Sequence, residues 1–143
     1  MPKVTKVPKV MDNKEFSKGL EKRTRKFAVS IIQLSSTLPN TPEGRVIRNQ
    51  ITKSGTSIGA NYREANRARS KADFKNKIKI CESEASETQY WIEVIVDAKW
   101  LSWEKVRSEY DVWDCSPFFH LSGKGKSIKG LTLVHFRHFS SLE

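Results

Sequence analysis

The stretch that decides the fold is Ser54-Gly55-Thr56-Ser57-Ile58-Gly59-Ala60-Asn61-Tyr62-Arg63-Glu64-Ala65, which resembles a loop when it is read alone. Its flanks favour a helix, because apolar or small residues recur at the spacing of one helical face. These residues are Ile47, Ile51, Ser54, Ile58, Tyr62 and Ala65. Each glycine inside a helix costs about 1 kcal/mol relative to alanine. Gly55 and Gly59 therefore predict that a neighbouring backbone approaches this helix closely, since glycine has no Cβ to hold it away.

The next stretch predicts the helix that packs against it. Alternating steps of four and three residues keep one apolar seam on a partner helix, as in antiparallel bundles. The seam consists of Phe74, Ile78, Cys81, Ala85, Thr88, Ile92 and Ile95.

A second apolar strip lies about 100–150° from this seam, at 100° per residue. It consists of Ile80, Trp91 and Val94, with Glu84 and Glu87 beside it. The strip contacts either another neighbour within the bundle or another subunit. In the second case the two carboxylates would orient the partner subunit electrostatically.

Start and stop signals divide the rest of the chain. A first helix is expected from Asp12 or Asn13, and Thr41-Pro42-Glu43 favours a capped start to the second. Ser70 or Asp73 can cap the third helix, and a fourth begins near Trp103. The apolar face of the first helix is Phe16, Leu20, Phe27, Ile31, Leu34 and Leu38.

These elements predict an all-α fold, an antiparallel up-and-down four-helix bundle over residues 12–114. Cys115-Ser116-Pro117 interrupts the fourth helix, so we expect it to be short or disrupted. Residues 1–11 are expected to form a basic flexible arm and residues 115–143 an irregular or divergent tail, in which Leu131–Phe136 has the pattern of a strand. No apolar run approaches the roughly 18–20 residues of a membrane span. With only 2 cysteines, a cytoplasmic location is expected.

Charge is distributed unevenly along the chain. Residues 1–42 carry 9 basic and 3 acidic side chains, residues 43–80 carry 10 and 3, and residues 81–97 carry none and 5. Two basic blocks and one acidic block indicate a polyanionic partner, with nucleic acid as the leading candidate. The alternative is a basic surface that only keeps the protein soluble.

The candidate nucleic-acid-binding residues lie opposite the apolar faces of the first two helices. Arginine suits phosphate especially well, because its planar fork binds two oxygens at once. Cations along one helical side would follow a phosphate backbone and make binding salt-sensitive. The candidates are Lys18 and Arg25 on the first helix, and Arg45, Lys53, Arg63, Arg67 and Lys71 along the second.

The sequence patterns that could support catalysis or cofactor binding each lack a required residue or spacing. Gly125-Lys126-Ser127 resembles the end of a P-loop, but His120 occupies the position of the required first glycine. Cys115, His120, His135 and His138 have no zinc-finger spacing. Cys81 has no histidine nearby in sequence to act as its base. We therefore expect no enzyme activity, no metal and no cofactor.

Three segments together resemble a known bacterial family. They are Ser57–Ala65, Phe74–Cys81 and Glu84–Trp91, within a match over about residues 12–105. The family comprises the proteins encoded in intervening sequences of 23S ribosomal RNA genes, also called S23 ribosomal proteins, and it includes the accessory variability protein of diversity-generating retroelements. The resemblance implies a four-helix bundle, a homopentameric ring and nucleic-acid binding without known catalysis.

The sequence thus predicts a non-catalytic bundle that binds nucleic acid, RNA or DNA, with RNA favoured, and the resemblance implies that it assembles into a ring. The alternative is a structural or protein-interaction scaffold, such as an accessory subunit of a reverse transcriptase.

Overall fold

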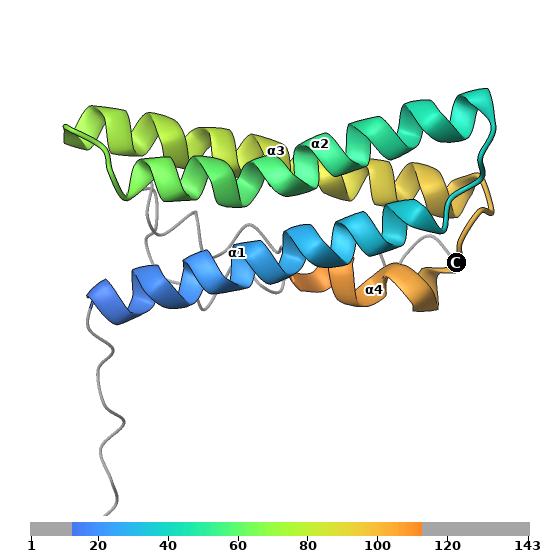
Figure 1. Ribbon diagram of the computed structural model, residues 1–143, viewed down its shortest axis with the longest axis horizontal. Helices are drawn as coiled ribbons and strands as arrows, with labels where there is room; N and C mark the ends of the chain where they lie inside the picture. Colours follow the sequence, from blue (N-terminus) through green and yellow to red (C-terminus); the bar gives the residue numbers. More distant parts are fainter. Residues whose placement is uncertain (1–12, 113–143) are drawn as a thin grey trace, which may run out of the picture.

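Four α-helices run up and down beside one another in the computed structural model, which describes residues 13–112 (Figure 1). They are α1 (Asn13–Ser36), α2 (Pro42–Ala65), α3 (Lys71–Asp97) and α4 (Trp103–Val112). α2 packs against both α1 and α3, and α4 touches α1 and α3 on the opposite side. The expected all-α antiparallel bundle is confirmed, and residues 13–112 contain no strand.

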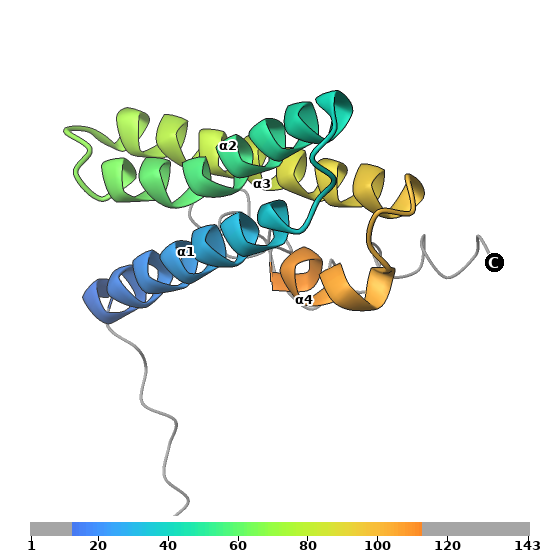
Figure 2. The same ribbon diagram turned by 45° about the vertical axis from the view of Figure 1, so that its right-hand side comes forward.

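Within the described residues 13–112, the fourth helix is the short member, with 10 residues against 24, 24 and 27 in α1, α2 and α3. It lies along the half of the bundle where α1 and α3 end (Figures 1 and 2). Val106 is fully buried there, and the Tyr110 hydroxyl donates to Glu93 Oε1 of α3 at 2.8 Å. The arm at residues 1–11, the tail at residues 115–143 and the strand expected at Leu131–Phe136 lie outside the described residues.

Local side chains set the helix boundaries that the sequence predicts. Thr41 is the N-cap of α2 and accepts a hydrogen bond from the Gly44 amide at 3.0 Å. Ser70, rather than Asp73, caps α3 by accepting from the Asp73 amide at 3.1 Å. Each cap satisfies an amide that has no partner within its helix.

The C-terminal end of α1 has a partner that the sequence did not reveal. The guanidinium of Arg48, in the second turn of α2, donates to the carbonyl oxygens of Ser36 and Leu38. Carbonyls at the end of a helix lack partners within that helix, and a cation there also complements the helix dipole. This arginine of α2 therefore holds the α1–α2 connection.

The core follows the predicted seams closely. Of the expected core residues, only Phe16, Ile47 and Phe74 are partly rather than fully buried. Two polar residues of α1, Thr24 and Ser35, are buried in addition. The Thr24 hydroxyl donates to the Glu21 carbonyl at 2.9 Å, so its burial leaves no donor unsatisfied.

The two glycines of α2 explain how α1 comes close. A Cβ added to Gly55 would lie 2.8 Å from Ile31 Cγ2, and one added to Gly59 would lie 3.0 Å from Thr24 Oγ1. The prediction of a close neighbour is confirmed, but β-branched side chains of α1, rather than its backbone, occupy the space. Such side chains have few rotamers, so they cannot easily move aside.

Small side chains also bring α2 close to α3. Thr88 Oγ1 lies 2.9 Å from Ser54 Oγ and 2.8 Å from the Glu84 carbonyl oxygen, in a fully buried position. The thiol of Cys81 lies 3.5 Å from the Ile58 carbonyl oxygen. Among residues 13–112, no helix has the length and apolar character that crossing a bilayer demands.

Replacing Gly55 with alanine should destabilise the bundle. Overpacking against Ile31 costs about 1–3 kcal/mol, and the better helix propensity of alanine returns about 1 kcal/mol. We expect a net loss of up to about 2 kcal/mol in the free energy of unfolding, measured by urea denaturation.

Gly19 provides the matched control, because a Cβ added there meets nothing within 4 Å. Gly19→Ala should stabilise the protein by up to about 1 kcal/mol. Equal stabilisation by both substitutions would show that α1 and α2 are not closely packed at Gly55.

Candidate nucleic-acid interface

All seven predicted nucleic-acid-binding residues are exposed, but they do not form one patch. The sequence analysis grouped Lys71 with Arg67 along the second helix. In the structure, Lys71 is instead the first residue of α3. Arg45 and Arg63 point the same way, yet 18 positions separate them, which is about 27 Å along a helix. The predicted line of cations along α2 is therefore interrupted.

The structure instead gathers cations at one end of the bundle. The N-terminal half of α1 lies at the same end as the α2–α3 turn (Figure 1), and the Asn66 side-chain amide donates to Glu21 Oε1 at 2.9 Å. We call this region the basic end. We define it by seven of the exposed cations there, Lys14, Lys18, Arg63, Arg67, Arg69, Lys71 and Lys75, and Lys22 and Arg23 of α1 are exposed there as well.

Sequence reasoning missed three members of the basic end, Arg69, Lys75 and Lys14. Arg69, Lys71 and Lys75 line an open hollow of about 570 Å³ at the α2–α3 turn, with Phe74 at its side. The helical spacing of α2 gives no information about residues in the α2–α3 turn or at the start of α3, where Arg69 and Lys75 lie. For Arg69 and Lys75 the only signal was the excess of 10 basic over 3 acidic residues in 43–80, whereas Lys14 shares the polar side of the first helix with Lys18.

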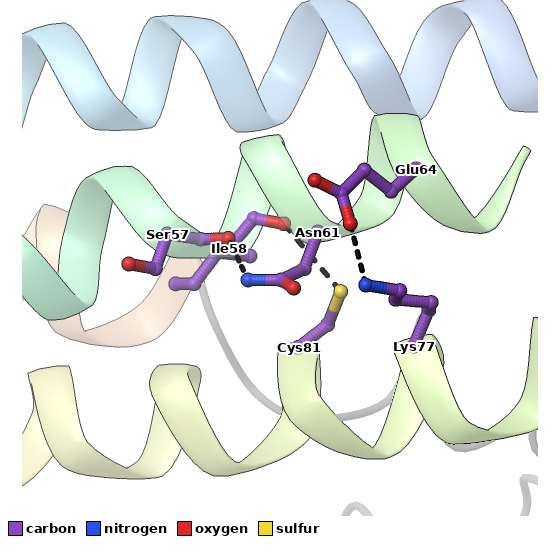
Figure 3. A network of polar contacts seen from close by, with 6 residues as sticks. All are labelled: Ser57, Ile58, Asn61, Glu64, Lys77 and Cys81. Atoms are coloured by element: carbon purple, nitrogen blue, oxygen red, sulfur yellow. Dashed lines mark hydrogen bonds and ion pairs between the residues drawn. The ribbon is translucent and has the colours of Figure 1, made fainter.

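One lysine near the basic end is already engaged. Lys77 Nζ of α3 lies 2.5 Å from Glu64 Oε2 of α2, and this contact raises the pKa of Lys77 (Figure 3). Both side chains remain partly exposed, so the pair adds little to stability. Beside it, the Asn61 side-chain amide donates to the Ser57 carbonyl at 2.9 Å. The polar side chains of Lys77, Glu64 and Asn61 on the surface between α2 and α3 thus already have partners within the chain.

The second half of α3 has the opposite charge. Burial, followed by the charge of Glu87, raises the pKa of Glu84, and Lys53 of α2 opposes this shift. The Trp91 indole donates to Glu87 Oε1 at 3.2 Å, and the Tyr90 and Trp91 rings meet edge to face at 5.0 Å. Trp91 and Val94 are half-buried, and Ile80 remains 40% exposed. The predicted second strip is therefore an acidic, aromatic surface with apolar area still open to solvent.

The sequence model of the 23S rRNA-intervening sequence protein family matches residues 20–114. The chain belongs to this family. One similar solved structure is a protein of unknown function from the S23 ribosomal protein family of Bacteroides thetaiotaomicron. It is 37% identical with a TM-score of 0.65, and the similarity covers 76% of this chain and 99% of that one. No curated protein matches the chain.

The family match includes the greater part of both candidate surfaces. It begins at Leu20, so the α2–α3 turn and the acidic strip of α3 lie inside it, whereas Lys14 and Lys18 precede it. In this family member, residues 13–112 contain no group of three histidine, cysteine, aspartate or glutamate side chains placed to hold a metal ion.

Cys81 is the cysteine of the described residues 13–112, and its surroundings suppress its reactivity. The thiol faces the Ile58 carbonyl of α2 (Figure 3). The side chain is fully buried, and this burial raises the pKa of the thiol to about 12. Because the thiolate is the reactive form, Cys81 stays inert at neutral pH. Its role is to fill the α2–α3 seam.

Cys81 should resist iodoacetamide in the folded protein at pH 8, with peptide mass spectrometry as the readout and urea-unfolded protein as the fully reactive control. The unfolded chain loses the thiol proton near the ordinary value of 9.0, but the folded protein holds it to about 12. This contribution to stability is therefore complete below about pH 9 and lost as the pH rises toward 12. Cys81→Ala should remove that part of the pH dependence. Rapid labelling of native Cys81 would contradict the assignment.

Proposed function

We propose that this member of the 23S rRNA-intervening sequence family binds nucleic acid, structured RNA in particular, without catalysing a reaction. The observation that carries the proposal is the basic end, where three chain segments present exposed cations together. Cations from separate segments match a folded RNA, whose phosphates approach from several directions. The family name, which refers to ribosomal RNA, supports RNA over DNA.

The chemistry of the basic end favours contacts to phosphate rather than to bases. Arg63, Arg67 and Arg69 offer planar forks that hold two phosphate oxygens each. Phe74, the aromatic residue at the hollow, is only partly exposed, so it offers little area for base stacking. Binding through phosphates positions a nucleic acid but reads little sequence.

Assembly into a ring forms part of the proposal. The resemblance to the family implies a homopentamer, and the acidic strip of α3 offers a subunit contact through Ile80, Trp91 and Val94. A ring would repeat the basic end around its circumference. Repetition raises avidity without any new contact, because later contacts on the same RNA become intramolecular.

The proposed absence of catalysis and the proposed cytoplasmic location are both supported by Cys81. Cys81 is a free thiol whose burial keeps it protonated, which suits a packing role and a reducing compartment. Together with a ribosomal-RNA partner, this favours the cytoplasm.

A second candidate function is a protein-interaction scaffold, such as an accessory subunit of a reverse transcriptase. The acidic strip of α3 favours it, since Tyr90 is 55% exposed beside Trp91, and exposed aromatic residues are enriched at protein interfaces. In that case the basic end would meet an acidic protein surface instead of RNA.

The double substitution of Arg63 and Arg67 with glutamate should weaken RNA binding about tenfold or more at low salt. It should also reduce the slope of log affinity against log salt by about 2, because about two phosphate contacts are lost. Filter binding with several unrelated structured RNAs should show a similar factor for each.

The matched control replaces Lys105 and Arg107 of α4, both exposed, with glutamate. This variant has the same net charge but an intact basic end, and it should bind within about threefold of wild type. Equal losses in the two variants would mean that only net charge matters. An unchanged affinity in the Arg63/Arg67 variant would identify the basic end as an ordinary solvated surface.

A further inference from the structure

An apolar patch on α1 has no partner among the other helices. Val29 is 49% exposed and Ile32 is 50% exposed, one turn apart on the side of α1 away from the core. Arg25 lies one turn before Val29, and it is exposed as well. We call these three residues the α1 patch. It is apolar and basic.

The strip on α3 has the complementary character. Ile80, Trp91 and Val94 supply its apolar area, and Glu84 and Glu87 supply negative charge. Burial and Glu87 raise the pKa of Glu84, so an approaching cation would relieve the crowding of negative charge that Lys53 offsets within the chain. Apolar side chains beside acidic groups on α3 thus match apolar side chains beside a cation on α1.

Contacts inside the bundle place the two surfaces at the same height along its axis. α2 touches Thr24 of α1 at Gly59 and Cys81 of α3 at Ile58, so Thr24 and Cys81 are level. Ile31 and Thr88 lie one heptad further along α1 and α3. Ile31 meets Gly55 of α2 and Thr88 meets the adjacent Ser54, so Ile31 and Thr88 are level as well.

The interval from Thr24 to Cys81 equals that from Ile31 to Thr88, so the register is constant over this region. It places Arg25 within one turn of Glu84. The same register places Val29 and Ile32 level with Glu87 and Trp91, again within a turn.

Helix direction fits the same arrangement. α1 and α3 run the same way, because each is antiparallel to α2 (Figure 1). A rotation about an axis parallel to the bundle preserves both direction and height. It therefore allows α1 of one copy to lie beside α3 of the next with cation facing carboxylate and apolar area facing apolar area.

We propose that the α1 patch of one copy packs against the α3 strip of a second copy, in a heterologous contact. The inference rests on the assembly part of the proposed function, and it supplies the surface that the α3 strip meets. Two different surfaces joined head to tail generate a ring when the rotation closes, whereas a self-complementary contact would stop at a dimer.

The test uses two variants that each lack one surface, Ile32→Glu on α1 and Trp91→Glu on α3. Each should keep its helical content by circular dichroism and be monomeric by light scattering at micromolar concentration, where wild type is assembled. An equimolar mixture should form a 1:1 heterodimer that grows no further, because one intact α1 patch and one intact α3 strip remain. Gln33→Glu, an exposed neighbour on α1, is the control and should assemble as wild type does.

A second pair of variants tests the register. Arg25→Glu should weaken assembly about tenfold or more, and adding Glu84→Arg to it should restore most of the loss. Restoration is expected only if these side chains meet across the contact.

The outcomes separate this inference from the proposed RNA function, because mass is measured without RNA. A monomeric wild type would overturn it, as would normal assembly of Ile32→Glu. Absence of the mixed heterodimer would show that the α3 strip meets itself or another protein, and would also overturn it. RNA binding that still depends on Arg63 and Arg67 would then leave the proposed function standing.

Discussion

The close approach of α2 to both neighbours is the constraint on which the rest of the structure depends. A Cβ at Gly55 would overlap Ile31 of α1, one at Gly59 would press on Thr24, and Ser54 meets Thr88 of α3 through a buried hydroxyl contact. Larger side chains at these positions would separate the helices. The small residues of α2 therefore set how α1 and α3 lie relative to each other, although the backbones of those two helices do not approach closely.

This packing leaves the outer surfaces free to carry charge. The core uses aliphatic, aromatic and small hydroxyl side chains, whose polar atoms are satisfied within their own helix or across the seam. The cations collect at the basic end, and the carboxylates collect on the second half of α3. The same register that α2 imposes also places the α1 patch level with the α3 strip, so core packing and the proposed assembly have one geometrical origin.

Periodicity predicted the parts of the fold that depend on local sequence. The three seams, the Thr41 cap and the glycine contacts were expected, because burial of one helical face leaves a repeat that can be counted. The role of Arg48 was not expected, because its carbonyl partners, Ser36 and Leu38, lie at the end of α1 and the sequence of α2 carries no signal for this contact.

The candidate site was predicted less completely than the fold. Angles around a helix identified which cations face solvent, and all seven do. Angles do not report separation along the axis, so Arg45 was grouped with Arg63 from which it is far away. Arg69 and Lys75 were missed because they join the site only through the arrangement of the chain segments, whereas Lys14 lies on the same polar side of the first helix as Lys18 and was left out of the candidates. Val29 and Ile32 were missed for a related reason, since isolated apolar residues on a helix are uninformative until their exposure is known.

Amide hydrogen exchange, measured residue by residue in the native protein, tests the central claim most directly. If the small-residue face of α2 organises the bundle, amides from Ile51 to Tyr62 should exchange only through global unfolding. Their opening free energies should equal the free energy of unfolding from denaturant titration, while those in α4 should be lower. Opening free energies in this part of α2 that fall below the global value, or below those of α4, would contradict the account.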